Sequence, residues 1–182
     1  MKNNTFWFGL GILLLLLIAG CSKNTVNGNN LINEGDTPIG NIRNLQAPDF
    51  TVKTTDGNTI KLSELTAQNK PVLVYFMATW CPYCRQDLAS VNRVYPKYKE
   101  DVEFIAIDLD LTENAKQLKN YKERGNYDFT FALGNPKVLT AYGVRGTTGK
   151  FAVGRDGILL YTGYGVLQDK HWETIFGGLA SS

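Results

Sequence analysis

An apolar run that leads directly into two closely spaced cysteines sets the architecture of this chain. Residues 72–77 are six apolar or aromatic residues in a row, which is typical of a central strand covered on both faces of its sheet. Cys81 and Cys84 follow after a short junction. The residues beyond them predict a helix, because apolar positions recur at three- and four-residue steps. These positions are Cys84, Leu88, Val91, Tyr95 and Tyr98. Pro96 is expected to bend or end this helix.

The rest of the chain alternates short strand-like and helix-like segments. Further strands are expected at residues 50–52, 59–62, 102–107, 129–132, 150–153 and 158–161. Helices are expected at about residues 113–124 and 137–142, and from Asp169 onward, where Trp172, Ile175, Phe176 and Leu179 form an apolar stripe. Asp56-Gly57 marks a hairpin turn between the first two strands, and Asp156-Gly157 marks one between the last two. This order predicts an α/β fold with a central sheet flanked by helices.

Composition excludes several classes of protein. Of the 182 residues, 43% are apolar and 20% are charged, as in ordinary globular domains and unlike disordered, collagen or coiled-coil chains. The net charge of +2 gives no basic field for nucleic acid, so no nucleic-acid partner is expected. Three cysteines are too few for a disulfide-stapled mini-protein. The single histidine, His171, fits a surface or cap position better than a metal site, and we expect no metal.

The N-terminal residues are typical of an export signal. A lysine at position 2 precedes a thirteen-residue apolar run at positions 6–18, and small residues then lead to Cys21. This run is short for a transmembrane helix, which needs about twenty residues, so residues 1–20 are interpreted as a signal peptide. The ending at residues 18–21 resembles a bacterial lipobox, which implies a lipid on Cys21. Residues 21–46 have the polar composition of a flexible tether, which leaves residues 47–182 as a single domain.

The cysteine pair is predicted to exchange disulfides. At a helix start, free backbone N–H groups and the helix dipole favour a thiolate on Cys81. Pro82 suits the first helical turn because it has no N–H to leave unpaired there. Cys84 lies one turn further, where its thiol can break a mixed disulfide formed on Cys81. Two other interpretations stay open: a purely structural disulfide, or half of a zinc site completed by carboxylates.

Several segments together resemble the TlpA/ResA-like thiol-disulfide oxidoreductases of the thioredoxin superfamily. The matching segments are residues 47–50, 56–57, 62–65, 72–84, 141–147 and 151–157, within a likeness that covers about residues 42–180. The resemblance implies a thioredoxin fold whose mixed sheet is preceded by a hairpin and interrupted by a helical insertion. It also implies work outside the cytoplasm on protein disulfides, apocytochrome c among them. No dissociable cofactor is expected, since the redox-active disulfide itself serves.

Three positions depart from the patterns of these proteins. The family usually carries a cis proline opposite the cysteines, where this chain has Thr148 after Thr147. This change either only reshapes the loop, as we expect, or alters client binding and metal access. Thioredoxins have a buried Asp six residues before the first cysteine, where this chain has Tyr75. Asp87 is therefore the candidate for proton handling at Cys84, unless it is a solvated surface carboxylate. The Pro82-Tyr83 pair is similar to that of glutaredoxins and leaves the reduction potential open.

The leading hypothesis is a lipid-anchored, monomeric oxidoreductase on the outer face of a cell membrane. It would reduce protein disulfides with electrons from a transmembrane thiol relay. Trp80 is expected to pack beside the thiols and to contact clients. A peroxidase is disfavoured, because its motif requires a threonine where this chain has Ala78. A disulfide-forming oxidase and a copper-binding module are the alternatives. Two thiolates suit Cu(I), although no cluster of His or Met accompanies them.

Overall fold

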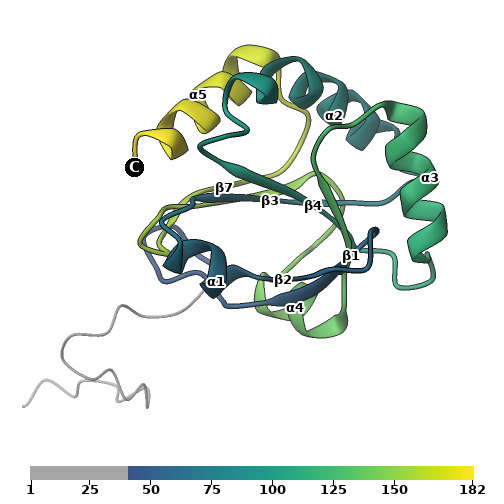
Figure 1. The fold of residues 1–182 in the computed structure, drawn as a ribbon, viewed down its shortest axis with the longest axis horizontal. Coiled ribbons are helices and arrows are strands. Elements are labelled where there is room, and N and C mark those ends of the chain that lie inside the picture. Colours follow the sequence, from purple (N-terminus) through teal and green to yellow (C-terminus); the bar gives the residue numbers. More distant parts are fainter. Residues whose placement is uncertain (1–40) are drawn as a thin grey trace, which may run out of the picture. The chain divides into compact units, whose positions relative to one another are not determined.

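Residues 41–182 are the part of the chain that the structure, a computed structural model, describes. The signal segment, Cys21 and most of the predicted tether lie outside the described residues. The strands are β1 (Thr51–Thr54), β2 (Thr59–Lys61), β3 (Val72–Met77), β4 (Glu103–Asp108), β5 (Thr130–Leu133), β6 (Gly149–Val153) and β7 (Leu159–Gly163). They form one seven-stranded sheet in the order β2-β1-β5-β4-β3-β6-β7 (Figure 1).

The sheet is mixed, which confirms the predicted fold class. β4 pairs in parallel with both β3 and β5, whereas the β1–β2, β1–β5, β3–β6 and β6–β7 pairs are antiparallel. β3 lies in the interior of the sheet between β4 and β6, and all six of its residues are buried. The apolar run of the sequence is thus a strand covered on both faces.

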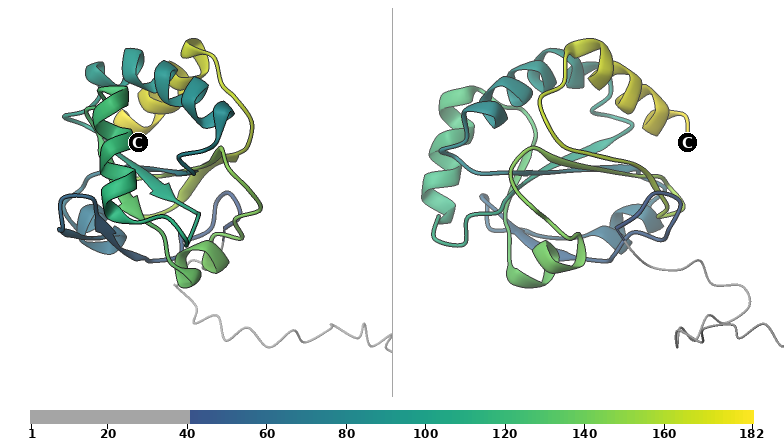
Figure 2. Two further views of the ribbon diagram at one scale, coloured as in Figure 1. Left: turned by 90° about the vertical axis from the view of Figure 1, so that its right-hand side faces the viewer. Right: turned by 180° about the vertical axis from the view of Figure 1, so that it is seen from behind.

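Helices cover both faces of the sheet (Figures 1 and 2). They are α1 (Leu62–Ala67), α2 (Pro82–Val94), α3 (Ala115–Gly125), α4 (Pro136–Ala141) and α5 (Asp169–Ala180), with the 3-10 turn η1 (Tyr95–Lys97) after α2. Side chains along β3 alternate between the two sides. Tyr75 belongs to a core with α2, α3 and α5, and Phe76 belongs to a second core with residues of α1 and α4.

Local chemistry sets the ends of the central helices. Asn114 caps α3 by accepting hydrogen bonds from the first-turn N–H groups, while the Gln117 side chain accepts one from the backbone N–H of Asn114. Asn126 ends the same helix in the left-handed conformation that asparagine tolerates. Pro82 occupies the first turn of α2, and Pro96 lies in η1, where α2 ends. Pro82 thus begins α2 directly after Cys81, which is the N-cap residue of that helix.

Two expectations from the sequence need correction. The expected tether extends too far, because residues 44–46 pair with the start of β7. Asn44 N–H donates to the Leu159 carbonyl, the Leu159 N–H donates to the Leu45 carbonyl, and Gln46 forms a β-bridge with Ile158. The sequence pattern also did not predict α1, which follows β2 without a break and has no side-chain N-cap.

Candidate active site at the start of helix α2

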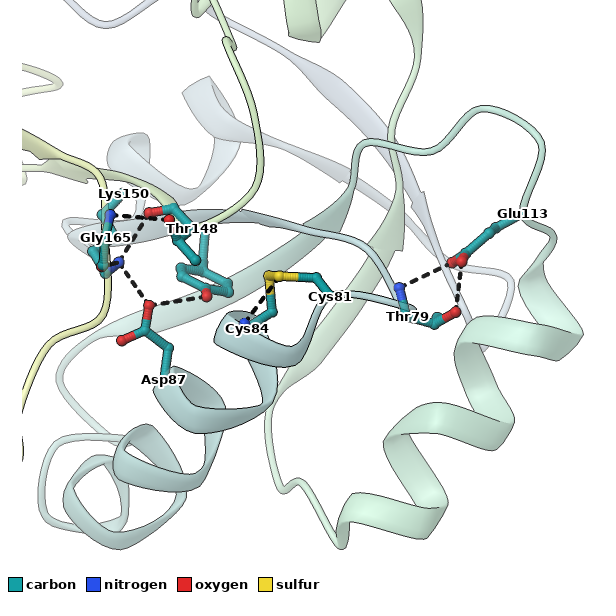
Figure 3. The surroundings of a disulfide bond; sticks show 9 residues. Thr79, Cys81, Cys84, Asp87, Glu113, Thr148, Lys150 and Gly165 are labelled. Atoms are coloured by element: carbon teal, nitrogen blue, oxygen red, sulfur yellow. Dashed lines mark hydrogen bonds and ion pairs between the residues drawn. A yellow bond between two sulfur atoms is a disulfide. The ribbon is translucent and has the colours of Figure 1, made fainter.

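Cys81 and Cys84 form a disulfide at the N-terminus of α2 (Figure 3). Their Cα atoms are 5.3 Å apart. Cys81 is the N-cap residue, and its Sγ accepts a hydrogen bond of 3.0 Å from the backbone N–H of Cys84. In the reduced protein the same N–H and the helix dipole would stabilise a thiolate on Cys81. The helix start therefore supplies the local field that the sequence predicted.

Both cysteines are buried in the disulfide form, whereas their neighbours are exposed. Cys81 is 1% exposed and Cys84 is fully covered, but Trp80 and Tyr83 are 62% and 61% exposed. The Trp80 indole N–H donates a hydrogen bond of 2.8 Å to the Asp110 carboxylate. Access of a protein thiol to Cys81 therefore requires a local movement. The exposed side chains of Trp80 and Tyr83, which flank Cys81 in the sequence, are not packed in the core.

Asp87 is a buried carboxylate one turn beyond Cys84 on α2. Its side chain is fully buried, so the interpretation as a solvated surface residue is wrong. Oδ2 accepts hydrogen bonds from the Tyr75 hydroxyl at 3.0 Å and from the Lys150 ammonium at 2.7 Å. Oδ1 accepts one from the Leu167 N–H at 2.7 Å. Tyr75, at the position where thioredoxins carry an aspartate, thus contacts the carboxylate that α2 supplies instead.

Lys150 completes this network from β6. Its ammonium is also fully buried and donates to the carbonyls of Thr148 at 2.9 Å and Gly165 at 2.5 Å (Figure 3). Burial lowers the pKa of Lys150, and the hydrogen bond and charge of Asp87 oppose that change. Burial raises the pKa of the Tyr75 hydroxyl, and the Asp87 charge raises it further. A neutral tyrosine therefore accompanies the ion pair.

Thr148 has an unusual backbone conformation. Its φ angle is +64°, in the left-handed region that β-branched residues rarely adopt. Two hydrogen bonds hold it there: the Gly165 N–H donates to its hydroxyl at 2.9 Å, and its carbonyl accepts from Lys150. The register of β6 against β3 pairs Gly149 with Phe76, so Thr148 lies beside the end of the strand that leads to Cys81. Thr147, its neighbour, is half-exposed.

A second group of carboxyls lies on the other side of the cysteine junction. Glu113 accepts hydrogen bonds from the hydroxyl and the N–H of Thr79 (Figure 3). Asp108, at the end of β4, is 1% exposed, and its Oδ2 has no hydrogen-bond partner among residues 41–182. Burial raises the pKa of Asp108 to about 8, and Glu113 adds to the rise as hydrogen-bond partner of the protonated form. Oδ2 thus gains a partner when it takes up a proton.

The described part of the chain offers little for a metal. Among residues 41–182, no three His, Cys, Asp or Glu side chains lie close enough together to hold an ion. His171 is exposed on α5. No helix in this part of the chain is long and apolar enough to cross a membrane.

The sequence predicted the centre of the site better than its surroundings. The structure joins Cys81 and Cys84 and places Asp87 on the buried side of α2, as expected. It adds Lys150, which the sequence pattern did not single out. The signal for it was a lysine in an otherwise apolar strand, since a buried ammonium requires a partner of opposite charge.

Comparisons with known proteins agree with this site. The model of the AhpC/TSA family matches residues 44–162. The thiol-disulfide oxidoreductase ResA of Bacillus anthracis is 32% identical over 159 residues, which cover 86% of each chain. This chain belongs to the AhpC/TSA family and is a ResA-like thiol-disulfide oxidoreductase. The family assignment confirms the thioredoxin-superfamily resemblance, and the chain carries the Cys81–Cys84 pair.

Two further proteins support the assignment. The thioredoxin-like protein YneN of Bacillus subtilis is 31% identical over 125 residues, 68% of each chain. The crystal structure of a candidate thiol:disulfide interchange protein DsbE from Chlorobium tepidum has a TM-score of 0.66 and 27% identity, and covers 76% of this chain and 98% of that one. The likeness therefore extends to the fold of nearly the whole domain.

Proposed function

We propose that this oxidoreductase works outside the cytoplasm, anchored to a membrane by a lipid on Cys21, and reduces disulfides of client proteins. The observation that carries the reaction is the disulfide at the N-terminus of α2, with the Cys84 N–H directed at the Cys81 sulfur. The lipobox-like ending before Cys21 supports the anchor. Apocytochrome c is the client class that the resemblance suggests.

The reaction takes two exchange steps. The Cys81 thiolate attacks one sulfur of a client disulfide, forms a mixed disulfide and releases the other client sulfur as a thiolate. Cys84 then loses its proton and attacks the Cys81 sulfur, which releases the second client sulfur as a thiolate and closes the Cys81–Cys84 disulfide; the proton from Cys84 and one from water convert the client thiolates to thiols. The client gains two electrons and the enzyme loses two. A transmembrane thiol relay would return them by the same exchange in reverse.

Asp87 is the group best placed to handle the proton of Cys84. It follows Cys84 by one helical turn and is buried in the same layer between α2 and the sheet. A carboxylate has about four lone-pair positions, and three hydrogen bonds occupy the Asp87 oxygens. One position is left to accept a proton, directly or through water.

Trapping the mixed disulfide tests this proposal. Cys84→Ser cannot complete the second step, so a client should remain bound through Cys81 in intact cells. Non-reducing electrophoresis should show an adduct that disappears on reduction, and Cys81→Ser should show none. If Cys84→Ser yields no adduct while Cys81 still reacts with an alkylating agent, the exchange mechanism is wrong.

The reduction potential tests the direction of electron flow. Thioredoxin-like reductases lie near about −270 mV and the strongest periplasmic oxidants near about −120 mV. We expect a value toward the reducing end, measured by equilibration with dithiothreitol buffers. A potential near that of the oxidants would favour a disulfide-forming oxidase over a reductase.

A further inference from the structure

Each N–H donor of the Lys150 ammonium makes a hydrogen bond, in the surroundings of the cysteine pair (Figure 3). An ammonium carries three N–H donors, and Lys150 directs them at Asp87, Thr148 and Gly165. β6 places it opposite Tyr75 of β3. Its Nζ lies 5.1 Å from the centre of the Tyr75 ring and 5.3 Å from that of Trp172. These three hydrogen bonds and two aromatic contacts together hold Lys150 in one position.

The three acceptors come from three segments around the disulfide (Figure 3). Asp87 belongs to α2, the helix that carries Cys84. Thr148 belongs to the loop next to the end of β3, and Gly165 to the segment between β7 and α5. Lys150 thus connects the helix of the exchange centre to the two loops that flank it. An apolar residue at this position could fill the space but could not make these connections.

The charge of Lys150 also matters for the sulfurs. Asp87 and Lys150 are both fully buried, where charges interact more strongly than in water. Exchange requires a thiolate on the same helix, and an unpaired carboxylate one turn away would disfavour that second negative charge. With Lys150 in place, the ion pair is neutral as a whole and the penalty is small.

We propose that Lys150 is a positioning residue of the exchange centre, which neutralises and holds Asp87 so that α2 can carry a thiolate. The inference rests on the proposed function, since it concerns the thiolate used in exchange. Other titratable groups near the pair are Tyr75 on β3 and Tyr161 on β7. Burial raises the pKa of both hydroxyls, and the Asp87 charge raises them further, so both are neutral throughout the test below.

The test compares two single variants with their double variant. Lys150→Met leaves Asp87 unpaired, Asp87→Asn leaves Lys150 unpaired, and the double variant has neither charge at nearly unchanged volume. The measurement is the rate at which reduced Cys81 reacts with iodoacetamide from pH 5 to pH 9. Fragmentation of the labelled peptides in the mass spectrometer assigns the label to Cys81 rather than to Cys84 or Cys21, so the full chain can be used.

We expect opposite deviations from the double variant. Because burial lowers the pKa of Lys150, Asp87→Asn is compared at the acidic end of the range, where the Lys150 ammonium should make Cys81 react about threefold to tenfold faster. At the alkaline end of the range, Lys150→Met should react about threefold to tenfold more slowly, because its buried Asp87 side chain has no cation beside it. Either comparison suffices if one single variant does not fold, and replacement of a buried pair by neutral groups is often tolerated.

The possible outcomes separate this inference from the proposed function. If all variants have superimposable rate profiles and differ only in stability, Lys150 is a structural residue and the inference is wrong. Deviations of the same sign for both single variants would also refute it. In either case wild-type exchange would continue. Loss of client trapping by Cys84→Ser in the wild-type background would instead contradict the proposed function.

Discussion

Asp108 gives the sharpest test of the electrostatics beside the cysteine junction. It ends β4 next to Met77 of β3, and burial is the main reason that its pKa rises from 3.8 to about 8. The unfolded chain therefore releases this proton near pH 4, whereas the folded protein keeps it until about pH 8. Between these values the folded state binds more protons, so the free energy of unfolding falls as the pH rises.

The size of this change in the free energy of unfolding follows from the difference between the folded and unfolded pKa values of Asp108. At about 1.36 kcal/mol per pH unit, a rise from 3.8 to about 8 corresponds to at most about 6 kcal/mol. Glu113 contributes to the rise, and the site borders the exposed Trp80 and Asp110 pair, where water reduces the effect. We therefore expect a loss of about 2–3 kcal/mol between pH 4 and pH 8.

Asp108→Asn should remove this dependence. The amide oxygen can still accept the hydrogen bond that Asp108 Oδ1 receives from the Asp110 N–H at 3.0 Å. The amide N–H₂ can donate to Glu113 without needing a proton from solvent. The variant should match the wild type near pH 4 and be more stable by about 2–3 kcal/mol at pH 8. Urea unfolding of the oxidised protein at one-unit pH steps measures the difference.

Asp110→Asn is the matched control. Hydrogen bonds from Thr112 and Trp80 lower the pKa of Asp110. The ionised Asp110 carboxylate therefore adds to the free energy of unfolding above pH 4, and this contribution is lost only in acid, which is the opposite dependence to that of Asp108. The wild-type decline between pH 4 and pH 8 should persist in Asp110→Asn. If Asp108→Asn declines as steeply as the wild type, the proton on Asp108 is not the cause and the reasoning fails.

Two further predictions concern Thr148 and Cys21. Thr148→Pro restores the usual residue of the family, yet it should destabilise the protein by about 2–4 kcal/mol relative to Thr148→Gly, because proline cannot adopt the φ of +64°. Both variants lose the hydroxyl, so Thr148→Gly is the control for that loss. Equal midpoints of urea unfolding for the two variants would refute the argument. Cys21→Ser should move the protein from the membrane fraction to the soluble fraction of cells, whereas unchanged membrane association would show that lipid on Cys21 is not the anchor.

The fold was largely predictable because local sequence patterns indicate most of its strands and helices. The apolar residues 72–77 and the helical repeat after Cys84 gave β3 and α2, and Asp56-Gly57 gave the first hairpin. α1 was missed because a six-residue helix without a side-chain cap leaves little periodicity to detect. The end of the tether was placed too late, since pairing of residues 44–46 with β7 depends on a strand more than one hundred residues away.

The polar network around Asp87 was predictable only in part, for a similar reason. Its partners Tyr75, Lys150 and Leu167 lie 12, 63 and 80 residues away in the sequence. Helical spacing could place Asp87 on the side of Cys84 but could not name these donors.

A different argument could have found one of these donors, Lys150. Lys150 occurs in a strand whose other residues are apolar or glycine, and a buried ammonium needs a carboxylate partner. Asp87 is the only acidic residue of α2, the helix that carries the cysteines. The requirement that buried charges be paired, applied to the predicted core, could therefore have suggested Asp87 as a partner for Lys150 from the amino-acid sequence.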